Sequence, residues 1–415
     1  MRIFLNYFLL VLAVLPLTGM NFTVSDKFLI FINVISLFAF FGTKQKVDGF
    51  IFVIIGIFLL INILSILFLG YLDGYTLFGF ILRLTAPYLI IKVIGKDFLD
   101  IFPKFALVMA LASIPFYIIQ LINYNLLLNT FSYYKFLTID IRLLAGKFSF
   151  FFYTIDINAI ERNCGFLWEP GGFGYFIGMA IMLLLIKTKF KFNLHVLLLI
   201  GVGLTTLSTT FYIFIIITII FTVIYNVRSH SGIIFLLPFF AFLIFYIMSQ
   251  DFMMQKINKH FDDAAAITST TRLGENQDKL GRYGNFKIEM GDFINYPLGY
   301  GINENGKTKT SFGEFASGPC GLSHHIARWG ILGLVFLLIM LSKLNFYLNK
   351  NYNRNIIYYP TIVIILFLFS NPIDRDSLLI AFLYLPYTSS ILIKSRNNKI
   401  KKDSNFFNII NYNNY

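Results

Sequence analysis

The chain has 415 residues, of which 57% are hydrophobic and only 13% are charged. A soluble domain of this length could not bury so much apolar surface, so lipid must solvate most of the chain. The net charge of +13 does not indicate nucleic-acid binding, because the basic residues lie mostly beside the ends of apolar segments, where they orient membrane proteins and contact anionic headgroups.

The first segment, MRIFLNYFLLVLAVLPLTGMNF, has a basic start and an apolar run but no clear small-residue cleavage site. This pattern predicts a first transmembrane helix and not a removed signal peptide. Several later runs approach or exceed the ~18 apolar residues that span a bilayer. We predict an all-α polytopic membrane protein, a single membrane domain over residues 1–415 with about twelve transmembrane helices. The predicted spans are 3–21, 28–42, 49–69, 75–94, 101–123, 171–186, 193–207, 209–226, 232–249, 321–341, 355–370 and 376–393.

The distribution of basic residues predicts the orientation of these spans. With the N-terminus inside, every inner loop carries Lys or Arg, whereas the short outer loops keep only Lys27 and Arg375. Both termini are then cytoplasmic, and residues 394–415 form a basic cytoplasmic tail. Two long segments, 124–170 and 250–320, fall on the outer side, and long loops of this kind are usually functional.

The first outer segment ends in RNCGFLWEPGGFG, residues 162 to 174. Pro170 suits the start of a helix, the glycines permit close backbone approach, and a helix N-terminus favours a nearby anion. Two interpretations remain open. Arg162 and Glu169 either form an ion pair that holds the loop on the membrane face, or border a binding site for an anionic, lipid-linked substrate.

The second outer segment contains RYGNFKIEMGDFINYPLGYGINENG, residues 282 to 306. The spacing of Arg282, Phe286, Glu289 or Met290, and Phe293 predicts an amphipathic helix along the membrane surface, ended by the turn Pro297–Gly301. Arg282 is either solvated there or faces the same cavity as Arg162.

The chain then re-enters the membrane through GLSHHIARWGILGL, residues 321 to 334. His324 and His325 lie at the outer mouth of the predicted tenth span, with Arg328 one turn further on. Adjacent histidines on a helix point about 100° apart and form a poor metal pair, but a neutral imidazole can accept a proton from a sugar hydroxyl. A histidine with no role beyond the interface is the alternative. Arg83 lies about 12 Å from the outer end of the fourth span, where it either snorkels to the membrane surface or faces a polar cavity, and we favour the cavity.

No metal-ligand spacing, nucleotide-binding loop or nucleophile motif is evident, so we expect neither a metal nor a cofactor. Cys164 and Cys320 both fall on the outer side. A disulfide between the two outer segments and a pair of free thiols both remain open, because sequence gives no distance.

These motifs, in this order, resemble the O-antigen polymerase (Wzy-type) family, which is related to the O-antigen ligases. The resemblance rests on an Arg followed by Gly-Phe-x-Glu-Pro, on the Arg282 helix ending in PLGYG, and on Gly321-Leu…Trp329-Gly-Ile-Leu-Gly333. It covers about residues 75 to 340. It implies a GT-C-like glycosyltransferase of the bacterial inner membrane with a periplasmic active site. Such enzymes polymerise oligosaccharide repeat units carried on undecaprenyl pyrophosphate, for lipopolysaccharide or a related surface polysaccharide, and a chain-length regulator is a further expected partner.

The resemblance also implies roles for individual residues. Arg162 and Arg282 match the arginines that hold pyrophosphate, and we add Arg83 and Arg328 to this set. His324 or His325 matches the base, with Glu169 and Glu314 as alternatives. Guanidiniums suit a doubly charged leaving group without a metal ion, because they stay charged and bind phosphate oxygens bidentately. The aromatic candidates for sugar stacking are Trp168, Tyr283 and Trp329.

Two other functions remain open. A ligase would transfer finished glycan to lipid A-core, and a flippase would move the lipid-linked oligosaccharide across the membrane. The absence of a detectable internal repeat argues against the flippase.

Overall fold

The computed structural model describes most of the membrane-type segments. The described residues are 2–20, 22–23, 25–70, 74–132, 147–150, 152–226, 254, 258, 282–303, 320–353, 355–356, 358–370 and 376–388.

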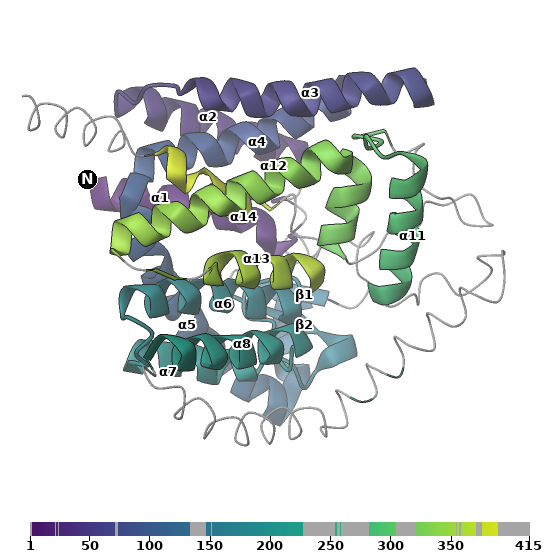
Figure 1. Ribbon diagram of the computed structural model, residues 1–415. Coiled ribbons are helices and arrows are strands. Elements are labelled where there is room, and N and C mark those ends of the chain that lie inside the picture. The colour runs from purple at the N-terminus through teal and green to yellow at the C-terminus, as the bar shows by residue number, and fades with distance from the viewer. Residues whose placement is uncertain are drawn as a thin grey trace, which may run out of the picture.

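The described chain is mostly helical (Figure 1). Eleven of the twelve predicted spans contain helix, and the ninth, 232–249, lies outside the described residues. The α-helices are α1 (Arg2–Val14), α2 (Asp26–Gly42), α3 (Gly49–Leu69), α4 (Gly74–Ile94), α5 (Phe98–Ser132), α6 (Pro170–Lys187), α7 (Leu194–Leu204), α8 (Thr209–Asn226), α11 (Arg282–Asn295), α12 (Gly321–Tyr352), α13 (Tyr359–Ser370) and α14 (Ser377–Tyr384).

Five helical stretches of the described chain are long and apolar enough to cross a membrane: α3, Gly74–Thr130 with α4 and α5, α6, α8 and α12. In α3 only 33% of the most apolar window is buried, and Phe52, Leu67 and Phe68 are largely exposed. Exposure of such a large apolar face is unfavourable in water but not in lipid. The structure therefore supports a membrane protein, and the number of spans stays a prediction.

The helix α6 forms the centre of the bundle, with 89% of its apolar window buried. It contacts α5, α7, α8 and α13. Gly174 faces Phe211, and Gly178 lies so close to the Phe367 ring that a Cβ would approach it to 2.4 Å. At least two of the glycines near the Glu-Pro motif thus serve close helix packing.

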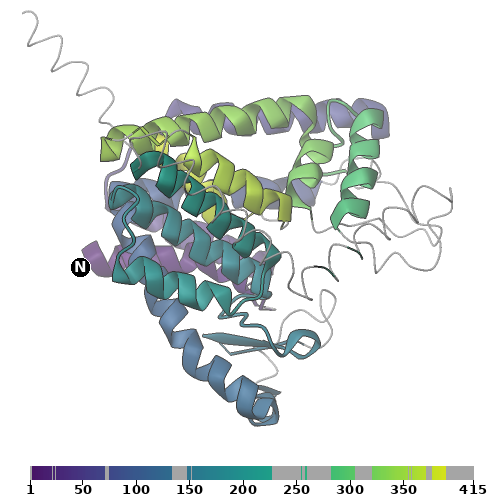
Figure 2. The same cartoon turned by 60° about the horizontal axis from the view of Figure 1, so that its bottom comes forward.

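The first outer segment contains strands, which the all-α prediction did not include. Strands β1 (Lys147–Phe150) and β2 (Tyr153–Asp156) form an antiparallel hairpin beside the second half of α5 (Figure 2). The predicted end of the fifth span, residue 123, is a kink in a longer helix, where Asn123 has φ −152° and ψ 81°. The hairpin buries Tyr153 against α5 on both sides of the kink, with Phe116 before it and Leu127 after it, and the Tyr153 hydroxyl donates to Gln120 Oε1 at 2.9 Å.

The hairpin and α11 lie toward the end of the bundle opposite the N-terminus, which we call the α11 end (Figures 1 and 2). At the N-terminal end, basic residues of the predicted inner loops pair with aspartates: Lys92 Nζ lies 2.8 Å from Asp48, and Lys187 bonds Asp100. The described parts of the two predicted outer segments thus lie at one end of the bundle, and the side of the membrane that this end faces stays a prediction.

Candidate active site

A glycine kink divides α12 near the predicted base. Gly330 has φ 62° and ψ −162°, a backbone conformation that is essentially restricted to glycine. Residues 321–329 therefore form a short helix beside α11, and the long apolar helix begins at Ile331 (Figure 1). This corrects the predicted tenth span, 321–341, which treated the two parts as one helix.

The kink docks on the turn that follows α11. Gly301 N donates to Arg328 O at 2.8 Å, and Ile331 N donates to Pro297 O at 2.9 Å. A Cβ on Gly330 would lie 2.3–2.5 Å from the backbone of this turn. We call this contact between residues 297–301 and residues 328–331 the glycine joint. It connects the second and third sequence motifs, which the sequence analysis treated separately.

A buried asparagine of α3 holds the glycine joint against the bundle. Asn62 Oδ1 accepts from Ile302 N at 2.8 Å, and its Nδ2 donates to Phe58 O at 2.7 Å. Gly301 has φ 62°, and a Cβ there would approach Asn62 Oδ1 to 2.3 Å. Sequence reasoning missed Asn62, although a carboxamide inside a run as apolar as α3 is itself a signal of a specific partner.

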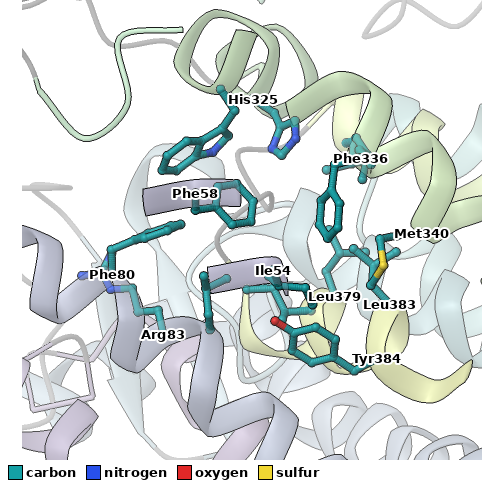
Figure 3. A pocket seen from close by; sticks show the side chains of 15 residues that line it. Ile54, Phe58, Phe80, Arg83, His325, Phe336, Met340, Leu379, Leu383 and Tyr384 are labelled. Carbon is teal, nitrogen blue, oxygen red and sulfur yellow. The ribbon is translucent and has the colours of Figure 1, made fainter. Parts of the chain in front are cut away.

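A cavity between five helices is lined by two of the predicted site residues, His325 and Arg83 (Figure 3). His325 and Arg83 lie at opposite edges of it, with Phe58 and Phe80 between them. Its volume is about 60 Å³, room for several water molecules. The other lining residues are almost all apolar and come from α3, α4, α12, α13 and α14: Ile54, Leu84, Trp329, Phe336, Leu337, Met340, Leu368, Leu379, Ile380, Leu383 and Tyr384.

His325 is held in one orientation at the top of this cavity. Its side chain is buried, and Nε2 lies 3.2 Å from Gly333 O. A carbonyl oxygen only accepts, so the proton of the neutral ring must be on Nε2. The structure thus brings His325 to the cavity of Arg83 and leaves its base role a prediction.

The helix α11 buries a polar face and not an apolar one. Asn285, Glu289 and Asp292 are each at most 5% exposed, whereas Ile294 is 73% exposed. This corrects the expected surface helix, whose apolar side was to include Phe286 and Phe293.

On this polar face, Glu289 meets His324, one of the two predicted catalytic histidines. Glu289 Oε1 lies 3.3 Å from His324 Nδ1, and the Ser323 hydroxyl donates to Glu289 Oε2. Sequence reasoning placed Glu289 on the helical spacing but gave it no role in the site, because a single chain gives no means of telling a buried polar face from a solvated one.

Arg328 and Trp329 are both buried beside the glycine joint. The Arg328 guanidinium lies 5.1 Å from the Trp329 ring. That ring packs against Phe58 and Phe80, with centroid distances of 4.7 Å to each. Trp329 is only 2% exposed, so it lines the cavity and does not offer a face to a sugar from solvent.

Arg162 lies in another part of the α11 end. Its Nε donates to Thr206 O in the connection between α7 and α8 at 3.1 Å, and its own carbonyl accepts from Gln120 Nε2. Next to it, Asn163 Nδ2 donates to Ser113 Oγ at 3.1 Å and to Thr205 Oγ1 at 3.0 Å. The first motif is therefore fixed to α5 and to the α7–α8 connection, while Arg83 and His325 lie in the cavity between α3, α4 and α12.

Glu169 is the N-cap residue of α6, with an extended backbone and a half-buried side chain. Beside it, Lys147 Nζ donates to Trp168 O at 2.8 Å and lies 5.1 Å from the Trp168 ring. The same amine forms a buried ion pair with Asp156 at 3.2 Å. The hairpin thus holds the Trp-Glu-Pro motif against the bundle.

Both cysteines are buried free thiols, so the disulfide alternative does not match the structure. Burial raises the pKa of Cys164 to about 12 and also raises the pKa of Cys320.

Three predicted residues cannot be placed in the site. Arg282 is the first residue of α11, and its side chain and that of Tyr283 lie outside the described structure. Glu314 also lies outside it. Within the described ranges no three His, Cys, Asp or Glu side chains are arranged to hold a metal ion.

No family model, curated protein or solved structure matches the chain. The site combines an apolar enclosure, a guanidinium at its edge, and two histidines with fixed rings on one short helix.

Proposed function

We propose that the protein is an inner-membrane glycosyltransferase that polymerises oligosaccharide repeat units carried on undecaprenyl pyrophosphate. The growing glycan would be transferred from its lipid carrier to a hydroxyl of the next lipid-linked unit at the periplasmic face. The proposal includes a GT-C-like arrangement of twelve spans with both termini in the cytoplasm.

The observation that carries the proposal is the cavity between Arg83 and His325. A lipid pyrophosphate is an amphiphile, and it needs an apolar surface next to a fixed cation. Transfer from it also needs a base for the attacking hydroxyl and charge stabilisation for the leaving group. The cavity supplies apolar walls from five helices and one guanidinium. The short helix 321–329 carries both candidate bases, His325 in the cavity lining and His324 next to it in sequence. Arg328, buried one turn after His324, adds a second guanidinium close to the same short helix.

The proposal is tested with purified protein and undecaprenyl-pyrophosphate-linked repeat units, with chelator present and no nucleotide sugar. We expect a ladder of glycans at repeat-unit spacing. No ladder, together with transfer of preformed glycan to an acceptor lipid, would indicate a ligase. Inactivity in both assays would refute glycosyl transfer and return the flippase as the better hypothesis.

The role of Arg83 is tested by Arg83→Met in the same assay. We expect at least about a 100-fold loss of chain extension, in line with removal of one charge-stabilising donor. Lys343→Met is the matched control, because Lys343 is a cation on the long part of α12 that lies over Phe50 and Tyr387 and away from the cavity. Arg162→Ala and Arg282→Ala complete the series, and an unchanged ladder would remove the arginine concerned from the mechanism.

A further inference from the structure

Burial of the polar face of α11 costs desolvation free energy, which contacts with neighbouring groups must offset. Asn285, Glu289 and Asp292 are spaced i, i+4 and i+7 and lie on the same side of the helix, toward the short helix 321–329. Moving a carboxylate out of water is unfavourable unless hydrogen bonds or opposite charges replace the lost hydration. The partners of Glu289 therefore indicate what this face is for.

Glu289 is fixed at both carboxylate oxygens. Oε2 accepts from the Ser323 hydroxyl, and Oε1 lies 3.3 Å from His324 Nδ1. An ionised carboxylate only accepts hydrogen bonds, so the proton of His324 belongs on Nδ1. Its lone pair is then on Nε2, the ring nitrogen farther from Glu289.

The neighbouring histidine is held in the opposite tautomer. His325 carries its proton on Nε2, because Nε2 lies 3.2 Å from Gly333 O. Two histidines adjacent in sequence are thus fixed by two different acceptors. The two candidate bases therefore differ in which ring nitrogen carries the proton, and the sequence alone does not show this difference.

The other titratable or charged groups on the helices packed here can be named. The helix α11 carries Arg282, Tyr283, Lys287 and Asp292 in addition to Glu289, and residues 320–329 carry Cys320, His325 and Arg328 in addition to His324. Of the other α-helices that contact α12, α13 carries Tyr359, α14 carries Tyr384, and α3 carries no titratable side chain. Glu289 brings a carboxylate oxygen to within 3.3 Å of the His324 ring.

We infer that Glu289 is the positioning residue for His324, and that His324, not His325, is the base of the transfer reaction. This inference rests on the proposed function. The acceptor hydroxyl loses its proton to His324 Nε2 as its oxygen forms a bond to the anomeric carbon of the donor sugar. The bond between that carbon and the pyrophosphate oxygen breaks, and the pyrophosphate leaves with the electron pair. Glu289 stabilises the resulting imidazolium through Nδ1.

The test distinguishes the effect of the Glu289 acceptor on the His324 tautomer from the effect of the Glu289 charge. Glu289→Met keeps the approximate volume of the side chain but removes the acceptor, whereas Glu289→Gln keeps an acceptor and removes the charge. The full chain, labelled with ¹⁵N-histidine, is studied by NMR, and the His324 signals are assigned by their loss in His324→Gln. Lys287→Gln is the control, because Lys287 is exposed on the same helix.

In the wild type we expect the His324 proton on Nδ1 and the His325 proton on Nε2. Glu289→Met should move the His324 proton toward Nε2 and leave His325 unchanged. Both Glu289 variants should lower chain extension by about 10- to 100-fold, the usual effect of losing a group that orients a functional histidine. Lys287→Gln should change neither the spectrum nor the activity.

A wild-type His324 protonated on Nε2, or a His324 spectrum unaffected by Glu289→Met, overturns the positioning role whatever the activity. Full activity of both Glu289 variants overturns it as well. A wild-type protein that shows the expected tautomers but forms no polymer refutes the proposed function instead, so the two failures are distinguishable.

Discussion

Replacement of Gly330 by alanine tests whether the glycine joint holds the short helix 321–329 in place. The left-handed backbone of Gly330 costs alanine about 1–3 kcal/mol. A Cβ would also lie 2.3–2.5 Å from the backbone of the turn, so the turn must move away. That movement breaks the hydrogen bonds from Gly301 N and Ile331 N, each worth about 1 kcal/mol. The closed joint should therefore lose about 3–5 kcal/mol relative to the open one.

The two cysteines make this loss measurable without an activity assay. Cys320 is fully buried at the start of the short helix and becomes accessible when that helix leaves α11. Cys164 is equally buried in the other outer segment and serves as an internal control. Because labelling follows the open population, 3–5 kcal/mol corresponds to about 10²- to 10⁴-fold faster maleimide labelling of Cys320, up to the rate of an exposed thiol.

Gly291→Ala is the matched control. Gly291 lies inside α11 without a left-handed φ, and a Cβ there would meet nothing within 4 Å. Alanine should be neutral or stabilise α11 by up to about 1 kcal/mol. Cys320 labelling in Gly330→Ala at the wild-type rate would show that the joint does not hold the short helix, and equal acceleration of Cys164 would indicate general unfolding.

Three further predictions follow from buried polar contacts. Asn62→Leu leaves Ile302 N without its acceptor and should destabilise the protein by about 1–3 kcal/mol, seen as a lower midpoint of detergent-solubilised thermal unfolding. Lys147→Met leaves Asp156 as a buried, unpaired carboxylate and should cost about 3–5 kcal/mol, whereas the double variant with Asp156→Leu should recover most of it. Burial raises the pKa of Cys164 to about 12, so the fraction of thiolate stays small up to pH 9. Maleimide labelling of Cys164 between pH 7 and pH 9 should therefore require denaturant. Rapid labelling of Cys164 in the native protein would contradict its buried position.

The helical segments could be predicted because their signal is local. Long apolar runs and adjacent basic residues are visible in sequence, and eleven of the twelve runs contain helix. The hairpin could not be predicted in the same way, because the burial of its residues, such as Tyr153, depends on packing against α5, which comes much earlier in the chain.

The site was predictable in its parts and not in its arrangement. The glycine at 330 was visible as part of a motif, but its left-handed conformation depends on the turn at residues 297–301. The same holds for Glu289, whose spacing fits a solvated or a buried face equally well. Arg162 and Arg83 could both be singled out as unusual cations, but their separation into two parts of the molecule depends on which helices pack together.

The hydrogen bond between Asn62 and Ile302 has a consequence for biosynthesis, since it joins positions 240 residues apart. At a translation rate of about 5–20 residues per second, Ile302 is synthesised about 10–50 s after Asn62. During that interval the ribosome has delivered a helix whose carboxamide oxygen has no Ile302 amide to bind. The nascent chain must keep Asn62 near water or near another donor until then, so the part of α3 around Asn62 should enter its final position late in membrane insertion.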